Sequence, residues 1–318
     1  MRTPKPCVLP VRPTTRRALL ASGMSAQMIR TALSSGRLIR VRSGVFLDAA
    51  LWPEDPREQH LLRAAAEVER FPAAVLSHES AGSSWQLPAP GFTDWHECLP
   101  SVTVPTAKLA RSRVGLAVHR VGSLPEAHLT RDDGGRPVTS LARTAVDLAA
   151  GRRLPEALVV LDAAARQLCR GMVAQPRRSD YANPRLIAAA REVLDQASAT
   201  RHPAGLAAMI ALADPRRESA AESLTAGHFH EAGLPAPRFQ EPLGSPGARL
   251  YPDCYWPDAN LVGECDGAVK YADEKGYVDE KEREQLLRDL GYRMVRWLAK
   301  EIMLTPELVV ARVARALG

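Results

Sequence analysis

Apolar positions along the first 50 residues change from helical to alternating spacing. The spacing predicts a helix over residues 15–21 and a second helix that begins at Ser25, its N-cap, and ends before Gly36. The next stretch, RLIRVRSGVFL, alternates apolar with basic or small side chains and contains a Ser-Gly turn, as a β-hairpin does. These elements predict a winged helix-turn-helix over residues 15–50, preceded by a proline-rich, flexible arm over residues 1–14.

Four arginines of this region are candidates for nucleic-acid contact. They fall on the second helix and on the hairpin, the parts of a winged helix that meet DNA phosphates, and they are Arg30, Arg37, Arg40 and Arg42. Two alternatives stay open. The arginines are ordinary solvated residues of a small helical domain, or the domain contacts protein instead of DNA.

Residues 51–150 are expected to form a mixed α/β connector domain. PREQHLLRAAAEVERF has apolar residues at helical spacing, SVTVP and GLAVHRV alternate as strands, and VTSLARTAVDLAA closes the segment as a helix. His78, His119 and His128 do not match the spacing of a metal site or of a nucleophile with its base. We therefore interpret them as structural histidines.

Residues 151–217 are rich in alanine and arginine and predict a helical bridge. Arginine clusters punctuate this segment at residues 177–178 and 216–217. We interpret them as solvated cations of an amphipathic bridge; the alternative is a basic face that follows a DNA backbone.

Residues 218–318 alternate helical and strand-like segments. The order is helix, strand, strand, helix, strand, helix, and VDEKEREQLLRDLGYRMVRWLAKEI gives a long charged helix followed by a strand. This order predicts a mixed-sheet α/β domain flanked by helices. The whole chain is therefore expected to be a multidomain α+β or α/β protein.

Two acids end the apolar run in LVGECDGAVKY. Glu264 and Asp266 are two residues apart, so on a strand they share one face. A hairpin turn over residues 257–260 would bring Asp253 beside Glu264, and Glu222 enters from the preceding helix. Four converging carboxylates repel one another unless a cation lies between them, and oxygen ligands suit Mg²⁺ or Mn²⁺.

A cation at this position predicts phosphodiester hydrolysis. It polarises a phosphoryl oxygen, lowers the pKa of a water molecule toward neutrality and stabilises the charge on the leaving oxygen. Lys270, or Lys281 on the following helix, would orient the attacking water or neutralise the transition state. The alternative is that Glu264 and Asp266 lie on an exposed strand edge, which leaves the other two acids unexplained.

Composition bears on the partner and the compartment. The 318 residues include 42 Lys and Arg, most of them arginine, against 36 Asp and Glu, a net charge of +6 that favours an anionic partner. The five cysteines are widely spaced without a CxxC pair, which indicates neither a zinc ribbon nor a disulfide framework and favours a reducing cytoplasm. The N-terminus lacks the apolar core of a secretory signal, and no stretch is apolar enough to span a membrane.

The N-terminal half carries a resemblance to a known family. Residues 16–48, with LSHESAGSSWQLP and GRPVTSLARTAVDLA behind them, resemble actinobacterial proteins similar to the abortive-infection (AbiEi-type) antitoxins of type IV toxin-antitoxin systems. The resemblance implies that the winged helix binds operator DNA, that a cognate toxin is a partner and that the protein serves phage defence.

The C-terminal hundred residues resemble the PD-(D/E)XK nuclease superfamily, and within it the endonuclease-like domains related to very-short-patch-repair endonucleases. The likeness lies in the ES pair at residue 222, YPDCYWPDANLVGECDG, the KY pair at residue 270 and EKEREQLLRDLGYRMVRW. It implies that Glu222 is the acid on the helix and that Asp253 and Glu264 are the two metal-binding acids. Asp266 occupies the position where the superfamily usually has its lysine, so activity depends on whether Lys270 or Lys281 reaches the site.

Two hypotheses of different classes follow. The first is a DNA-binding, Mg²⁺-dependent endonuclease; the second is a non-catalytic transcriptional regulator of the antitoxin type with a degenerate nuclease fold. An enzyme loses turnover without metal or without Glu264, whereas a regulator binds its operator in both cases. A third idea is a toxin-neutralising protein whose winged helix meets protein, with DNA affinity that depends little on salt.

Overall fold

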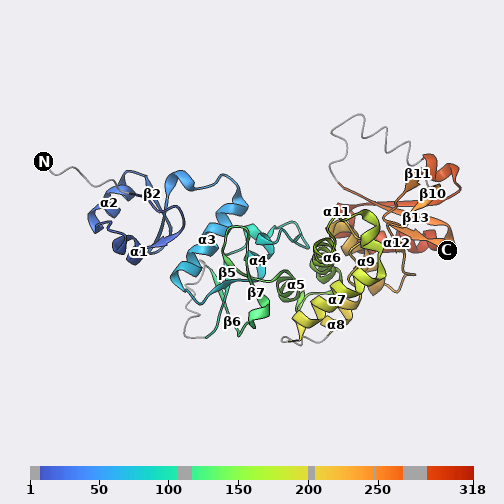
Figure 1. Cartoon of the computed structure of the whole chain (residues 1–318). Coiled ribbons are helices and arrows are strands. Elements are labelled where there is room, and N and C mark those ends of the chain that lie inside the picture. The colour runs from blue at the N-terminus through green and yellow to red at the C-terminus, as the bar shows by residue number, and fades with distance from the viewer. Residues whose placement is uncertain (1–7, 107–116, 200–204, 246–247, 268–284) are drawn as a thin grey trace. The chain divides into compact units, whose positions relative to one another are not determined.

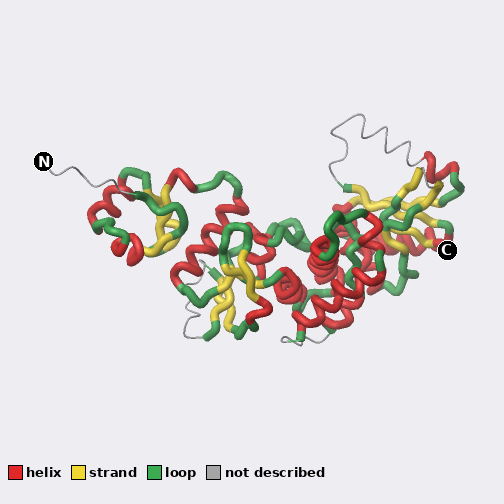
Figure 2. The backbone as a smooth tube through the Cα atoms, in the orientation of Figure 1, coloured by secondary structure: helices red, strands yellow, loops and turns green. Residues whose placement is uncertain are grey.

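The chain forms two compact units, each with its own helices and mixed sheet (Figures 1 and 2). Unit 1 comprises residues 1–87 and 93–148, and unit 2 comprises residues 88–92 and 149–318. None of the helices in the described part of the chain has the length and apolar character needed to cross a bilayer. The computed structural model describes residues 8–106, 117–199, 205–245, 248–267 and 285–318.

Unit 1 begins with two short helices and a three-stranded antiparallel sheet. The side chain of Thr15 accepts the Ala18 amide at 3.2 Å, and that of Ser25 accepts the Met28 amide at 3.1 Å. These caps confirm both predicted helix starts. The strand order is β1-β3-β2, and the elements are β1 (Thr14–Thr15), α1 (Arg16–Ala21), α2 (Ala26–Ser34), β2 (Leu38–Arg42) and β3 (Val45–Asp48).

The rest of unit 1 is a five-stranded mixed sheet with helices, in the order β6-β5-β4-β8-β7. Its histidines pair with neighbouring side chains, as expected of structural residues: His60 Nε2 lies 2.9 Å from Ser80 Oγ, and His119 Nε2 lies 2.9 Å from Glu67 Oε2. The elements are η1 (Ala49–Leu51), α3 (Pro56–Arg70), β4 (Val75–Leu76), α4 (His78–Ser84), η2 (Trp95–Glu97), β5 (Ser101–Val104), β6 (Val118–Val121), η3 (Glu126–His128), β7 (Leu129–Arg131), β8 (Pro137–Thr139) and α5 (Leu141–Ala149).

Unit 2 combines the alanine-rich helices with the C-terminal sheet in one compact body. Its helices α6 and α9 lie side by side (Figure 1). A Cβ at Gly227 would lie 2.3 Å from the Cα of Pro155, so only glycine permits this close approach. The helices are α6 (Leu154–Gly171), η4 (Arg178–Ala182), α7 (Pro184–Ser198), α8 (Leu206–Ala211), α9 (Ala220–Glu231), α11 (Ala299–Leu304) and α12 (Pro306–Leu317).

The main sheet of unit 2 has the order β14-β13-β12-β9, with β13 and β14 parallel and the other pairs antiparallel. One face packs in a core that includes Phe229, Trp256 and the buried Trp297. A Cβ at Gly263 would lie 2.8–2.9 Å from both tryptophan rings, so glycine lets them pack across β13. The strands are β9 (Arg238–Phe239), β12 (Cys254–Trp256), β13 (Leu261–Asp266) and β14 (Arg293–Leu298), with a separate hairpin of β10 (Leu243–Ser245) and β11 (Ala248–Leu250) and the turn η5 (Pro257–Ala259).

The charged helix expected before Gly291 falls partly on residues 268–284, which lie outside the described residues. Residues 285–289 are helical, and the described strand β14 follows. The mixed sheet flanked by helices that the sequence predicted for this region is present.

Candidate functional site

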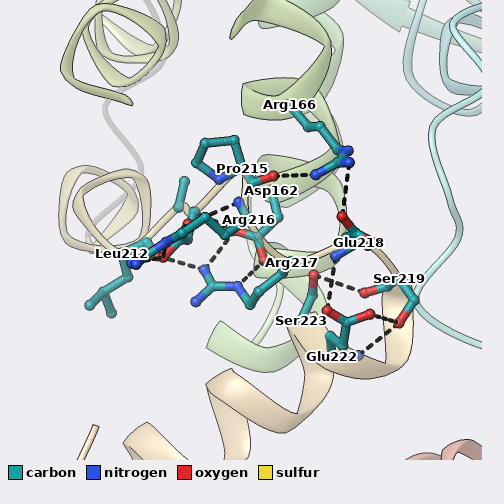
Figure 3. Close-up of polar contacts among 12 residues, drawn as sticks. Asp162, Arg166, Leu212, Pro215, Arg216, Arg217, Glu218, Ser219, Glu222 and Ser223 are labelled. Atoms are coloured by element: carbon teal, nitrogen blue, oxygen red, sulfur yellow. Dashed lines mark hydrogen bonds and ion pairs between the residues drawn. The ribbon is translucent and has the colours of Figure 1, made fainter. Parts of the chain in front are cut away.

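Glu222 lies in the first turn of α9 and folds back on the start of its own helix. Its amide donates to Ser219 Oγ at 3.2 Å, and that hydroxyl donates to Glu222 Oε1 at 2.8 Å (Figure 3). The Glu218 amide donates to Glu222 Oε2 at 3.0 Å (Figure 3). Ser219-x-x-Glu222 is a capping-box spacing, so the sequence carried a signal for this arrangement that we had not used. The contacts fix a buried carboxyl group in the first turn of the helix.

A buried ion pair ties this helix start to α6. Arg217 donates to both oxygens of Asp162, at 2.6 and 2.7 Å, and the two side chains are 4% and 1% exposed (Figure 3). Loss of either partner would leave a buried charge uncompensated. The segment that carries Glu222 is therefore held rigidly against α6.

Asp253 and Glu264 meet through the β12–β13 hairpin. Cys254 pairs with Gly263 in the antiparallel ladder, so the next residues outward, Asp253 and Glu264, face each other across the strands. The Cys265 amide donates to Asp253 Oδ2 at 2.8 Å. The turn over residues 257–260 thus gives the register that the sequence predicted.

Gln240 connects the helix acid to the hairpin acid. Its Nε2 donates to Glu222 Oε2 at 3.2 Å and to Asp253 Oδ1 at 3.0 Å, and its Oε1 accepts from Arg178. The backbone of Gln240 has φ 52°, a left-handed conformation that a non-glycine residue adopts only under tertiary constraint. No motif in the sequence marked this residue.

The surroundings of Glu222 raise the pKa of its carboxyl group toward neutral pH. Burial first and the neighbouring Asp253 second raise the pKa of Glu222, the hydrogen bonds from Glu218, Ser219 and Gln240 oppose the shift, and the net result is a pKa of about 7. Burial also raises the pKa of the Cys254 and Cys265 thiols, so neither supplies a thiolate nucleophile.

Asp266 shares the face of β13 with Glu264, as the alternation predicted, and it has a cationic partner. Arg296 donates to both carboxylate oxygens of Asp266, at 2.9 Å through Nε and 2.7 Å through Nη2. Arg296 stands opposite Glu264 in the parallel ladder with β14. Asp266, expected from the sequence to assist the metal ligands, forms an ion pair with a guanidinium that the sequence reasoning had missed.

The acids Glu222, Asp253, Glu264 and Asp266 line a cavity of about 540 Å³. Cations also border it, namely Arg178, Arg249 and Arg296. Lys270 and Lys281, the two expected catalytic cations, lie outside the described residues.

The donor set fits a hard divalent cation by chemistry, because it consists of carboxylate oxygens, and the buried Glu222 is repelled by the neighbouring Asp253. The ligand atoms of Glu222, Asp253 and Glu264 do not all lie within 4.8 Å of one another; within the described ranges that spacing occurs only for Asp94, His96 and Glu97. This exposed group is held by local contacts at η2, where the Asp94 amide donates to Glu97. The three site acids would therefore have to move together to hold one ion.

The four arginines expected to contact nucleic acid do not share one environment. Arg30, Arg37 and Arg40 are exposed on α2, the following turn and β2. Arg42 pairs with Glu67 of α3, and its side chain is 8% exposed. Arg42 is therefore an interior ion-pair residue and not a surface cation, because a long-range contact that no local pattern reveals has buried it.

Comparison with known proteins gives relatives but no described activity. No family model matches the chain. Two uncharacterized proteins of Mycobacterium tuberculosis, MT2308 of strain CDC 1551 / Oshkosh and Rv2248 of strain H37Rv, are each 30% identical to it over 299 residues. The alignment covers 92% of this chain and 97% of each relative, so it extends over most of both units. The chain belongs to the same family as these two mycobacterial proteins.

Proposed function

We propose that unit 2 is a divalent-metal-dependent nuclease domain that hydrolyses phosphodiester bonds of DNA in the cytoplasm. The observation that carries the proposal is that Glu222 from α9, Asp253 just before β12 and Glu264 from β13 line one cavity. A resemblance to the PD-(D/E)XK superfamily supports it, since the same three residues correspond to that superfamily's acids.

The three acids would hold Mg²⁺ or Mn²⁺. When bound, the ion supplies a water of lowered pKa and stabilises charge on the phosphate oxygens. Gln240 positions Glu222 and Asp253 through one amide. Asp253 and Glu264 are half-buried, whereas Glu222 is buried.

The cation of the site is Lys270 or Lys281 in this proposal, with Arg296 as the described residue closest to that role. Arg296 lines the cavity and forms an ion pair with Asp266. A guanidinium there would lower the electrostatic cost of bringing a phosphate onto a face that otherwise carries carboxylates.

Unit 1 would deliver the DNA. Two short helices followed by a hairpin support the interpretation of residues 15–50 as a winged helix, and Arg30, Arg37 and Arg40 are exposed on it. Arg42 has no part in this contact, because Glu67 holds it inside the unit.

The decisive experiment is cleavage of supercoiled plasmid with Mg²⁺, with Mn²⁺ and with EDTA. The full chain is compared with Glu264→Gln, Lys270→Ala and Lys281→Ala, and with Asp258→Asn as the matched control. Asp258 is an exposed acid of the same hairpin and lies outside the cavity lining. Metal-dependent nicking that Glu264→Gln abolishes and Asp258→Asn retains is the expected result; intact plasmid in every reaction contradicts the proposal.

A second candidate is a non-catalytic DNA-binding regulator of the antitoxin type. Two observations favour it. Arg296 donates hydrogen bonds to both carboxylate oxygens of Asp266, and Gln240 donates hydrogen bonds to the carboxylates of Glu222 and Asp253. In this case duplex DNA binds equally well in EDTA, Glu264→Gln leaves binding unchanged, and no metal produces cleavage.

A further inference from the structure

A second hollow, of about 150 Å³, adjoins the carboxylate cavity in unit 2. It has four arginines and two tyrosines in its lining, against one acid, Glu218. Arg178, Arg249 and Tyr251 line both hollows, so the two are adjacent. An excess of guanidinium groups thus stands directly beside a cluster of carboxylates.

The wall of this hollow that residues 166–182 form is preorganised. The guanidinium of Arg166 lies 3.9 Å from the ring centroid of Tyr181 and donates to the Pro215 carbonyl at 2.8 Å (Figure 3). The guanidinium of Arg178 lies 4.4 Å from the ring centroid of Tyr251. Stacked guanidiniums are held in place while their edges keep donors for an anion.

Glu218 joins this hollow to the acid site. Its side chain accepts from Arg166 at 3.1 Å and lies 3.4 Å from Arg178, while its amide holds Glu222. One residue therefore fixes two guanidiniums on one side and the buried carboxylate on the other. Gln240 makes a second link of the same kind, between Arg178 and the acids.

The remaining arginines complete the basic wall. Arg216 is fixed by Asp214, which accepts at 2.7 Å from Nη2 and at 3.0 and 3.1 Å from Nε. Arg249 is exposed beside the hollow on β11, and within the described part of the chain it forms no ion pair. A phosphate that enters would meet Arg249 and the half-exposed Arg178 without displacing a buried contact.

We infer that this arginine hollow binds the phosphodiester backbone of a nucleic-acid strand, next to the bond that lies over the carboxylates. The planar guanidinium matches phosphate oxygens in pairs, and the tyrosine rings give the sugar and base a flat surface. Only the position next to the cleaved bond rests on the proposed function, because binding of the backbone in this hollow needs no metal and no cleavage.

The test is fluorescence anisotropy of labelled single-stranded and duplex oligonucleotides with the full chain, in EDTA, over a series of NaCl concentrations. Arg30, Arg37 and Arg40 are replaced by alanine in all proteins compared, so that unit 1 does not mask unit 2. Into this background go Arg178→Ala and Arg249→Ala, singly and together. Arg185→Ala and Arg315→Ala are the matched controls, since both arginines are exposed on unit 2 helices outside the hollow.

The double variant is expected to bind about tenfold more weakly, with the slope of log K against log salt reduced by about 2, roughly one per phosphate contact. The controls stay within about twofold of the background protein. Affinity of the double variant equal to the controls overturns the inference. Arg249→Ala, which removes no ion pair among the described residues, decides the case if Arg178→Ala disturbs folding. If the protein cleaves plasmid but the double variant keeps its affinity, the nuclease proposal holds and the binding inference fails. If the double variant loses affinity but no protein cleaves plasmid, the binding inference holds and the nuclease proposal fails.

Discussion

Arg296 on β14 holds both carboxylate oxygens of Asp266 on the neighbouring parallel strand, at 2.7 and 2.9 Å. This pair occupies the position where the resemblance to nucleases leads one to expect a lysine. The charge of Asp266 is thereby taken out of the acid cluster, and the two acids at the end of β13 acquire different roles.

Asp266→Asn is expected to change Mn²⁺ affinity by less than about threefold, whereas Glu264→Gln weakens it more than about tenfold. The reason is that both oxygens of Asp266 already accept from Arg296, whereas Glu264 is one of the three proposed metal ligands. Isothermal titration calorimetry of the full-length variants measures both. Equal losses would show that Asp266 leaves Arg296 and binds the ion.

Mn²⁺ affinity is expected to rise with pH between about 6 and 8, because Glu222, with its pKa raised to about 7, must lose a proton before it can bind an ion. Below a pH of about 7 the Glu222 carboxyl holds a proton, which competes with the metal ion; above this pH the competition ends. Calorimetry at pH 6.5 in buffers of different ionisation enthalpy should record proton release on binding. In Glu222→Gln that release disappears; its persistence would assign the proton to another group.

Unit 1 is expected to lose about 2 kcal/mol of stability between pH 7 and pH 5 through His60. Burial lowers the pKa of His60 from 6.5 to about 4, so the unfolded chain binds a proton that the folded unit does not. Stability is therefore full above pH 6.5 and falls as the pH drops toward 4. Hydrogen exchange of the α3 amides over a series of urea concentrations measures the unfolding free energy of unit 1 alone, because α3 lies in that unit.

The control for this measurement is a pair of variants. His60→Gln should flatten the pH dependence of α3 protection, whereas His230→Gln, at an exposed site in unit 2, should leave it unchanged. A wild-type slope in His60→Gln would place the titrating group elsewhere.

Gly227→Ala is expected to destabilise unit 2 by about 1–3 kcal/mol, because the new Cβ would collide with the backbone of Pro155 at the α6–α9 contact. Urea unfolding, followed by tryptophan fluorescence and far-UV circular dichroism, gives the free energy of unfolding. Gly171→Ala is the matched control, since it lies in α6 and a Cβ there meets no atom within 4 Å. If both variants unfold alike, the close helix contact is not what restricts residue 227.

Features set by short stretches of chain could be predicted from the sequence. The caps at Thr15 and Ser25 depend on residues three apart, and the meeting of Asp253 with Glu264 depends on one turn. The common face of Glu264 and Asp266 follows from strand alternation alone.

Features set by distant contacts could not be predicted in this way. Gln240 meets its acids 18 and 13 residues away through a left-handed backbone conformation, and Arg296 meets Asp266 only because two strands 30 residues apart pair in parallel. The burial of Arg42 likewise requires α3 to pack against β2. Periodicity carries no information about such pairings, because each depends on how whole elements are placed.

The ion pair of Asp162 with Arg217 has a consequence for how this protein can be divided or recombined. A cut at residue 218 would remove Arg217 from the domain that carries the acids and would strip α6 from the apolar side of α9, where Leu158 and Val159 belong to the same core as Trp297. The four-stranded sheet and the arginine-bearing helices therefore belong to one structural unit. Exchange of this half between relatives should preserve its stability only when the junction lies near residue 149, where the two compact units part.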